Sequence, residues 1–309
     1  MKKTIFSTAV LALLFASCSN DEGITQPTQS LEGTPIQVNV AVADLQTRAG
    51  YDKSNLPEKF YMNVIHPNAN SKYTYKVLMK NEENVWNSKH LDTDETVQML
   101  WAGDDKQVSV TAATFSLAQN TIDLGVEADQ LTVGNVKSSD HLLMSTTSVT
   151  PSLSGIDVTF NHLMSKIKLV IELGTEFTAT ENPFTGVSIN GTLLKRKFNY
   201  TSKSWANIDS EIASTVTLFS NGFIAATDET KATGEFEAIL VPQTVASGNF
   251  SVTFLVDGRK FKWTSTEAIT LECGTEYTLK LTAGHDKVSS ASFAASAWNA
   301  GNSISGKTE

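Results

Sequence analysis

The most specific chemical pattern in the sequence lies at its end. Residues 301–308 read Gly-Asn-Ser-Ile-Ser-Gly-Lys-Thr, the G-x-x-x-x-G-K-[ST] spacing in which backbone amides and a lysine hold nucleotide phosphates. Such a loop joins a strand to a helix, because amides at the helix N-terminus bind the phosphates. Only Glu309 follows here, and strands do not alternate with helices along the chain. We therefore expect a Ser/Ala/Gly-rich tail and no nucleotide.

The other residues that could do chemistry form no recognisable site. The histidines are scattered, and neither of the zinc-binding spacings H-E-x-x-H and C-x-x-C occurs. The acidic run Asp92–Glu95 lacks the glycine and the terminal glutamate of an EF-hand loop. Asp140 and His141 with a distant serine could be drawn as a hydrolase triad, but nothing resembles a nucleophile elbow. The sequence thus predicts no catalytic residue, cofactor or metal, and no enzyme.

The N-terminus has the parts of an export signal. Lys2 and Lys3 precede an apolar run, Ile5–Ala16, which as a helix rises only about 18 Å, against ~30 Å for a bilayer core. Residues 1–17 are therefore interpreted as a signal peptide. Phe15-Ala16-Ser17-Cys18 resembles the lipobox of bacterial lipoproteins, with phenylalanine where leucine is usual. The resemblance implies a lipid on Cys18; an ordinary cleaved signal with an incidental cysteine is the alternative.

The residues that follow are expected to form a tether, residues 18–34. Gly23–Thr34 is rich in Thr, Gln, Gly and Pro, which is typical of a flexible spacer. Ser19-Asn20-Asp21-Glu22 resembles an acidic tag that sends lipoproteins of some anaerobic Gram-negative bacteria to the outer face of the outer membrane, although a solvated tether explains it equally. We expect a surface-exposed protein, lipid-anchored in the outer membrane.

The composition argues against nucleic acid as a partner. The formal net charge is −9, and removal of residues 1–17 takes away two lysines and leaves −11. The sequence has only two cysteines. Because Cys18 would carry the lipid, Cys273 has no partner for an intramolecular disulfide. We interpret Cys273, in a strand-like stretch, as a small buried hydrophobe.

Hydrophobic residues alternate with polar ones through most of the chain. This period of two, in short runs broken by Gly, Asn, Asp, Ser and Pro, predicts strands of β-sandwiches. The clearest runs are Ile36–Val42, Phe60–Val64, Val108–Thr111, Val158–Asn161, Ile167–Leu173, Phe236–Val241, Phe250–Val256, Lys260–Thr264 and Tyr277–Leu281. Asp257-Gly258 separates two of them and predicts a hairpin turn. We expect an all-β chain with an N-terminal domain, residues 35–163, and a C-terminal domain, residues 164–309.

Several segments together resemble the fimbrillin family, whose members are lipoprotein precursors of type V pili. Besides the lipobox, they are Thr47-Arg48-Ala49, Leu100–Gly103, Val108–Ala112, Ser139–Met144, Val158–Ile167, Ile239–Gln243, Gly274–Tyr277 and Ala297-Trp298. It is their order along nearly the whole chain that carries the resemblance. The family implies two tandem β-sandwich domains of transthyretin-like topology and no enzyme activity.

The resemblance also implies how such a subunit assembles. An Arg-specific protease would cut between Arg48 and Ala49, and the first strand, within residues 35–48, would leave. A strand from a neighbouring subunit, with the tail 288–304 as the expected donor, would replace it. The loop Gly50–Pro57 is expected to be accessible to the protease.

The cost of losing the first strand can be estimated. Its four aliphatic side chains, if fully buried, would contribute about 6–12 kcal/mol, comparable to the stability of a whole domain. The open groove would therefore need a new strand. The four residues are Ile36, Val38, Val40 and Val42.

The sequence leaves functional alternatives open. The leading hypothesis is a stalk, anchor or tip subunit of a cell-surface fimbria that supports adhesion. The second is a non-polymerising outer-membrane lipoprotein that binds glycan or a host ligand, for which one of five tryptophans could stack on sugars. A surface hydrolase is a third. Arg48 itself could be an ordinary loop arginine.

N-terminal sequencing of the protein from the cell surface separates these cases. A processed subunit should begin with an unmodified Ala49, because cleavage removes the anchor and the first strand together. A permanently anchored binding protein should begin with an acylated Cys18. Recovery of only the acylated form would contradict processing at Arg48.

Overall fold

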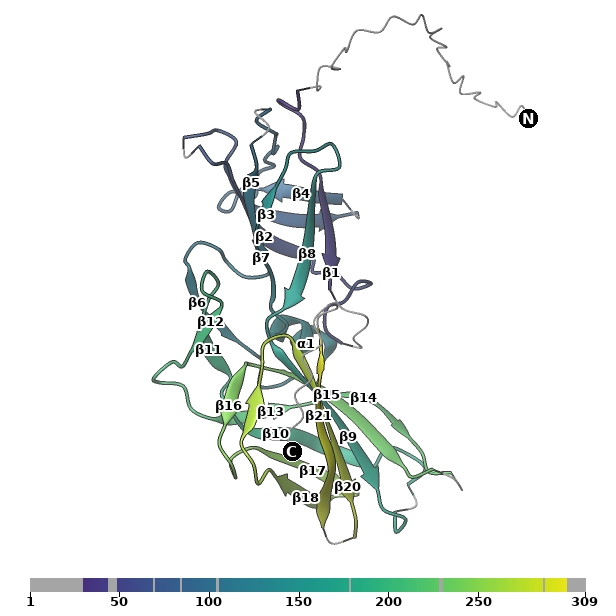
Figure 1. Cartoon of the computed structure of the whole chain (residues 1–309). Helices are drawn as coiled ribbons and strands as arrows, with labels where there is room; N and C mark the ends of the chain where they lie inside the picture. Colours follow the sequence, from purple (N-terminus) through teal and green to yellow (C-terminus); the bar gives the residue numbers. More distant parts are fainter. Residues whose placement is uncertain are drawn as a thin grey trace, which may run out of the picture. The chain divides into compact units, whose positions relative to one another are not determined.

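The computed structural model describes residues 30–298, except 44–48, 69, 84, 104–105, 178, 228–229 and 286. Within these residues it has twenty-one strands and one short helix, α1 (Val133–Ser139) (Figure 1). The all-β class predicted from the alternating pattern is therefore confirmed. No helix in the described ranges is both long enough and apolar enough to cross a membrane. Cys18, Arg48 and the tail from residue 299 lie outside the described residues.

A seven-stranded sheet organises the first half of the chain, in the order β1-β8-β7-β5-β2-β3-β4. Its strands are β1 (Val38–Val42), β2 (Lys59–Ile65), β3 (Tyr75–Glu82), β4 (Val85–Lys89), β5 (Val108–Ala113), β7 (Leu142–Val149) and β8 (Ile156–His162). Alternate residues point to one face, as a period of two requires, and bury Phe60, Met62 and Phe160 in one hydrophobic core. Trp101, after β4, completes this core and donates its indole N–H to the Ser152 carbonyl at 3.0 Å.

Two sheets pack face to face in the second half. The four-stranded sheet has the order β13-β10-β17-β18 and the five-stranded sheet the order β14-β15-β9-β20-β21. Their strands are β9 (Ser165–Leu173), β10 (Phe184–Thr192), β13 (Ser214–Thr217), β14 (Phe219–Ile224), β15 (Thr233–Leu240), β17 (Ser251–Val256), β18 (Arg259–Thr264), β20 (Thr275–Ala283) and β21 (Val288–Ala297). Leu169 and Leu279 from one sheet meet Ile189 and Phe254 from the other in a second core. This is a β-sandwich.

Smaller elements join the two halves. β6 (Thr121–Gly125) from the first half pairs with β11 (Lys195–Asn199) from the second, and β12 (Ser204–Ala206) extends that sheet. β16 (Gln243–Val245) pairs with β19 (Ile269–Leu271). A third hydrophobic cluster takes side chains from both halves, among them Phe115, Leu143, Phe198 and Val241. From Leu31 on, the described residues accordingly form one compact unit, and the division into domains at 163/164 and the transthyretin-like topology stay predictions.

The hairpin turn predicted from two consecutive residues is present in the structure. Asp257 and Gly258 both have positive φ, 48° and 79°, and join β17 to β18 as the predicted two-residue turn. Cys273 differs from its prediction, because it lies in the exposed turn between β19 and β20 rather than inside a strand.

Candidate functional site

β1 is the outermost strand of the seven-stranded sheet. Its single ladder is parallel to β8 and runs from the pair Val38↔Ile156 to the pair Val42↔Phe160 (Figure 1). The Ile156 amide donates to the Gln37 carbonyl at 2.8 Å, and the Ala43 amide donates to the Phe160 carbonyl at 2.8 Å. A strand with one neighbour can leave a sheet by breaking one ladder, whereas a central strand must break two.

The apolar face of the first strand covers the first core unevenly. Val42 is only 4% exposed, but Ile36, Val38 and Val40 are half-buried at the edge of the core. The estimate of about 6–12 kcal/mol assumed full burial of all four residues and is therefore too high. Half-burial of three side chains lowers the cost of exposing this face to about 4–8 kcal/mol, which is still a large fraction of a domain's stability.

The chain just before β1 is bound to a second edge. The Ile36 amide donates to the Met99 carbonyl at 2.9 Å, the Trp101 amide to the Thr34 carbonyl at 3.0 Å, and the Gly33 amide to the Trp101 carbonyl at 3.1 Å. Part of the predicted tether is thus ordered on the sheet. Residues 31–43 cross from the edge at Met99–Trp101 to the edge of β8, and their removal would open both.

Two glycines let this segment approach closely. A Cβ on Gly155 would lie 2.2 Å from the Gln37 carbonyl oxygen, and a Cβ on Gly103 would lie 2.4 Å from the Cβ of Glu32. Both glycines have positive φ, 83° and 74°, which disfavours a side chain in any case. The first strand can therefore pack this closely only because both positions are glycine.

The cleavage point proposed from the sequence borders a buried segment. Arg48 lies outside the described residues, but Ala49 is fully buried in the third cluster, and Gly50 and Asp52 are also buried. The prediction of an accessible loop over Gly50–Pro57 is therefore wrong for Gly50, Asp52 and Pro57, which are buried, whereas Lys53 and Ser54 are exposed. Asp52 accepts hydrogen bonds from the Ser54 amide at 2.8 Å and hydroxyl at 2.7 Å, which fixes the turn.

A buried polar group holds the segment after Ala49. The Asp140 carboxylate bonds to His162 Nδ1 at 2.7 Å and accepts the Tyr51 amide at 2.9 Å, and neither the Asp140 nor the His162 side chain is exposed. The Trp298 ring stacks on His162 with centroids 3.8 Å apart. Burial, and then the Asp140 and Glu58 carboxylates, raise the pKa of Tyr51. The link between α1 and β7, the end of β8, the Tyr51 turn and the residue after β21 thus meet at one acid–imidazole pair.

Lys166 extends this group toward the second half. Its ammonium lies 3.1 Å from Glu276 Oε2, 3.7 Å from Glu237 Oε2 and 5.7 Å above the Trp298 ring. A lysine that is 4% exposed requires such compensation.

The remaining sequence candidates stay apart in the structure. In the described ranges, no three His, Cys, Asp or Glu side chains are arranged to hold a metal ion. His141 faces the Gly125 carbonyl at 2.8 Å, while its neighbour Asp140 points to His162. Although Cys273 as a residue is exposed in its turn, its thiol lies against the protein, 3.9 Å from the His162 carbonyl. Loss of water around the sulfur raises the pKa of the thiol to about 11, against a smaller lowering effect of the Trp205 indole, so the thiol stays protonated near neutral pH.

Comparison with known proteins assigns this arrangement to a family. The model of the fimbrillin-like family matches residues 41–298. The chain belongs to the fimbrillin-like family. No curated protein matches the sequence. Membership supports a fimbrial or adhesin-like protein of the cell surface.

Two crystal structures share the fold. A candidate cell adhesion protein from Bacteroides ovatus is 15% identical with a TM-score of 0.62, covering 84% of this chain and 97% of its own. A candidate cell adhesion protein from Bacteroides uniformis is 18% identical with a TM-score of 0.56, covering 89% of this chain and 100% of its own.

The fimbrillin-like segments noted in the sequence meet in space. Ser139–Met144 and Val158–Ile167 bring together Asp140 and His162, because Leu142 pairs with His162 across β7 and β8. Both segments were recognised in the sequence, but the Asp140–His162 pair and its contact with Trp298 were not predicted. Asp140 and His141 are adjacent in the sequence, between α1 and β7, but their side chains have different partners: Asp140 bonds to His162 and His141 faces the Gly125 carbonyl.

Gly155→Ala should loosen the first strand specifically. The new methyl group must displace the Gln37 carbonyl, so the Ile156 and Ala43 amides should exchange hydrogen about tenfold faster or more in exchange mass spectrometry. Gly248→Ala is the matched control, because Gly248 also has positive φ, 80°, but nothing lies within 4 Å of its Cβ position. Both variants should lose about 1–2 kcal/mol from left-handed strain. Equal exchange in the two would refute the close-approach argument.

Asp140→Ala should destabilise the whole chain. It leaves the buried His162 ring without its carboxylate, which costs about 3–5 kcal/mol for buried pairs of this kind. Urea unfolding measures this loss. Asp123→Ala, on an exposed position of β6, should change stability by about 0.5 kcal/mol at most. A loss below about 1 kcal/mol for Asp140→Ala would show that the pair is not needed for packing.

Proposed function

We propose that the protein is a subunit of a cell-surface fimbria, exported as a lipoprotein precursor and assembled by protease-triggered exchange of its first strand. Cys18 carries the lipid that anchors the precursor in the outer membrane. An Arg-specific protease cuts between Arg48 and Ala49. The proposal contains no catalytic step for the chain itself.

The observation that carries this proposal is the edge position of β1. The strand has a single ladder, its apolar face is largely half-buried, and residues 44–48 lie between it and a firmly held segment. A cut at Arg48 would divide the chain at this boundary. Residues 31–43 could then leave while Ala49 and Tyr51 stay packed against the third cluster and Asp140.

The vacated groove defines what the incoming strand must supply. It must present aliphatic side chains at alternate positions, because β8 offers Ile156, Val158 and Phe160 on its buried face. It must also pair with the edges of β8 and of Met99–Trp101. Main-chain hydrogen bonds would give affinity and the apolar pockets would give register.

The tail is less suited to be the donor than the sequence suggested. β21 already pairs with β20 from Thr275↔Ala297 to Ala283↔Val288, and its Phe293 ring stacks on Tyr277 with centroids 5.4 Å apart. Donation of β21 would therefore break a long antiparallel ladder in its own subunit. We expect the donor to be residues after Trp298, or β21 only if the five-stranded sheet opens at this edge.

Arg48→Ala tests the proposal. In cells that assemble fimbriae, the native chain should give laddered, heat-resistant multimers on gels, because a donor strand locked in each groove resists dissociation. The variant should give monomer that still carries residues 18–48.

Lys53→Ala is the matched control, since it removes an exposed cation five residues further on that an Arg-specific protease ignores. It should assemble like the native chain. Multimers that persist in Arg48→Ala would overturn the proposed processing. Loss of multimers in both variants would indicate that assembly requires the positive charge of this loop and not cleavage at Arg48.

A further inference from the structure

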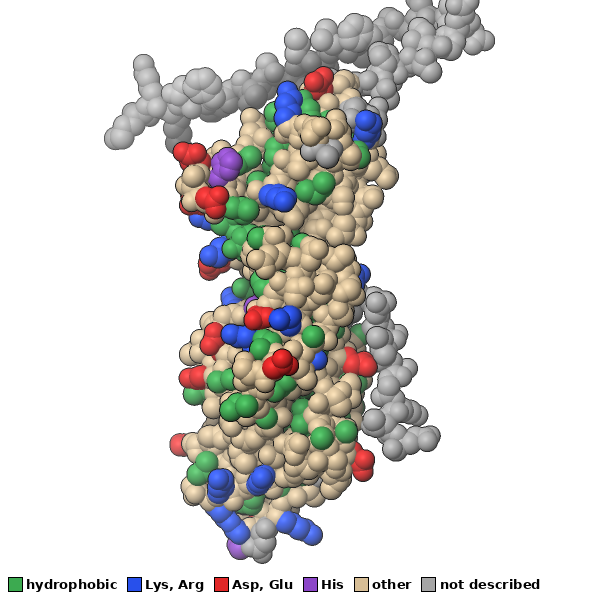
Figure 2. All heavy atoms as spheres, turned by 90° about the vertical axis from the view of Figure 1, so that its left-hand side faces the viewer, with side chains coloured by type: hydrophobic (Ala, Val, Ile, Leu, Met, Phe, Trp, Pro, Cys, Tyr) green, Lys and Arg blue, Asp and Glu red, His purple; other side chains and the backbone are tan. Residues whose placement is uncertain are grey.

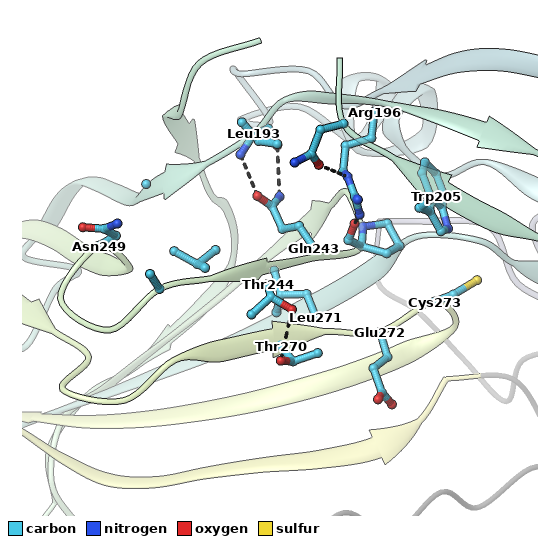
Figure 3. A pocket seen from close by; sticks show the side chains of 15 residues that line it. Leu193, Arg196, Trp205, Gln243, Thr244, Asn249, Thr270, Leu271, Glu272 and Cys273 are labelled. Atoms are coloured by element: carbon cyan, nitrogen blue, oxygen red, sulfur yellow. Dashed lines mark hydrogen bonds between the residues drawn. The ribbon is translucent and has the colours of Figure 1, made fainter. Parts of the chain in front are cut away.

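A solvent-open pocket of about 670 Å³ lies in the second half of the chain, between the β11–β12 arm and the β16–β19 ribbon (Figure 3). Its volume lies within the usual range for small-molecule sites. None of its lining residues belongs to β1 or β8. The lining residues with polar or aromatic groups are Arg196, Trp205, Asn207, Gln243, Thr244, Asn249, Thr270, Glu272 and Cys273.

The pocket walls are held in place by their own hydrogen bonds. Gln243 accepts the Leu193 amide at 2.8 Å and donates to the Leu193 carbonyl at 3.1 Å, which ties the β10–β11 turn to β16 (Figure 3). Thr244 and Thr270 face each other across the ribbon with hydroxyls 3.3 Å apart. A ligand would thus enter a largely preformed site.

Two charged residues, Arg196 and Glu272, line the pocket, and Arg196 is its cation. Its Nε–H donates to Asn207 Oδ1 at 2.9 Å, and another N–H donates to the Pro242 carbonyl. Burial lowers the pKa of the guanidinium, and no described carboxylate forms an ion pair with it. Figure 3 shows the Glu272 carboxylate directed away from it. Two of the five N–H donors are used, and the fork is oriented with donors left for an anion.

Trp205 supplies a flat apolar wall next to this cation. Of the five tryptophans, Trp101 and Trp298 are buried in hydrophobic clusters, and Trp86, Trp205 and Trp263 are partly buried against cores. Trp205 also lines this pocket, half-buried, and its ring packs against Phe198 with centroids 4.7 Å apart and the ring planes tilted by 40°. An indole beside hydroxyl and amide groups suits the face of a sugar ring, with its apolar C–H groups and its polar rim.

We propose that this pocket binds a carboxylated saccharide, with its carboxylate on Arg196 and its ring against Trp205. Asn207 holds the guanidinium in place, and Thr244, Asn249 and Thr270 bond the sugar hydroxyls. A neutral sugar would leave the cation unpaired, so the site selects for the acid. Figure 1 draws β11, β12 and β16 along one side of the chain, and Figure 2 shows mixed acidic and basic side chains on that side, not a general cationic surface.

The binding site does not depend on strand exchange. Binding can therefore be measured on the full chain whether or not Arg48 is cut, and failure of either proposal leaves the other intact.

The test compares methyl β-D-glucuronide with methyl β-D-glucoside, which differ in the carboxylate, and adds a methyl sialoside as a second acid. Saturation-transfer NMR and calorimetry should show the acids binding about tenfold or more tightly than the glucoside. Added salt should weaken the acids alone. The relative strength of the two acids identifies uronate or sialate. No binding of either acid at roughly 10 mM would overturn the proposal.

Arg196→Gln should abolish the preference for acids, and Lys195→Gln, one residue away and exposed on the same strand, should retain it. Thermal unfolding checks that each variant is folded. If Arg196→Gln does not fold, Arg196→Lys keeps the charge but loses the fork, and should bind the acids several-fold more weakly. Unchanged acid binding in the folded Arg196 variant would refute the assignment.

Discussion

The parallel ladder between β1 and β8 is the interaction on which the first half of the structure depends. It closes the edge of a seven-stranded sheet and places the aliphatic side chains of the first strand over Phe160 and its neighbours. Gly155 and Gly103 have no side chain, which leaves room for the segment around the first strand to pack against them. Yet the ladder is single, so the same contact that completes the core is the one most easily given up.

The contacts that join the two halves of the chain do not involve this strand. The third hydrophobic cluster, the pairing of β6 with β11, and the Asp140–His162–Trp298 group join the two halves without using β1. The Tyr51 amide bonds to Asp140, so the segment after Ala49 has an attachment that does not involve the first strand. The pocket at Arg196 lies on these permanent elements, so a bound ligand would not sense exchange of the first strand.

Much of the fold could be predicted from local pattern. Period-two runs such as Ile167–Leu173 became β9, and Asp257-Gly258 became a hairpin turn, because alternation and positive φ are properties of a few consecutive residues. The loop after Arg48 was misjudged for the same reason. Its Gly, Asp and Ser residues are typical of exposed turns, but Gly50 and Asp52 are buried by Asp140 and the third cluster, which come from distant parts of the chain.

The sequence by itself determined the all-β class and the family, since both rest on residue order. Only the tertiary structure decided that β1 runs parallel to β8 at an edge, that Asp140 pairs with His162 rather than His141 with a serine, and that Trp205 and not another tryptophan faces an open pocket with Arg196. These depend on which strands become neighbours. Burial energy summed over the whole chain makes that choice, and no local pattern encodes it.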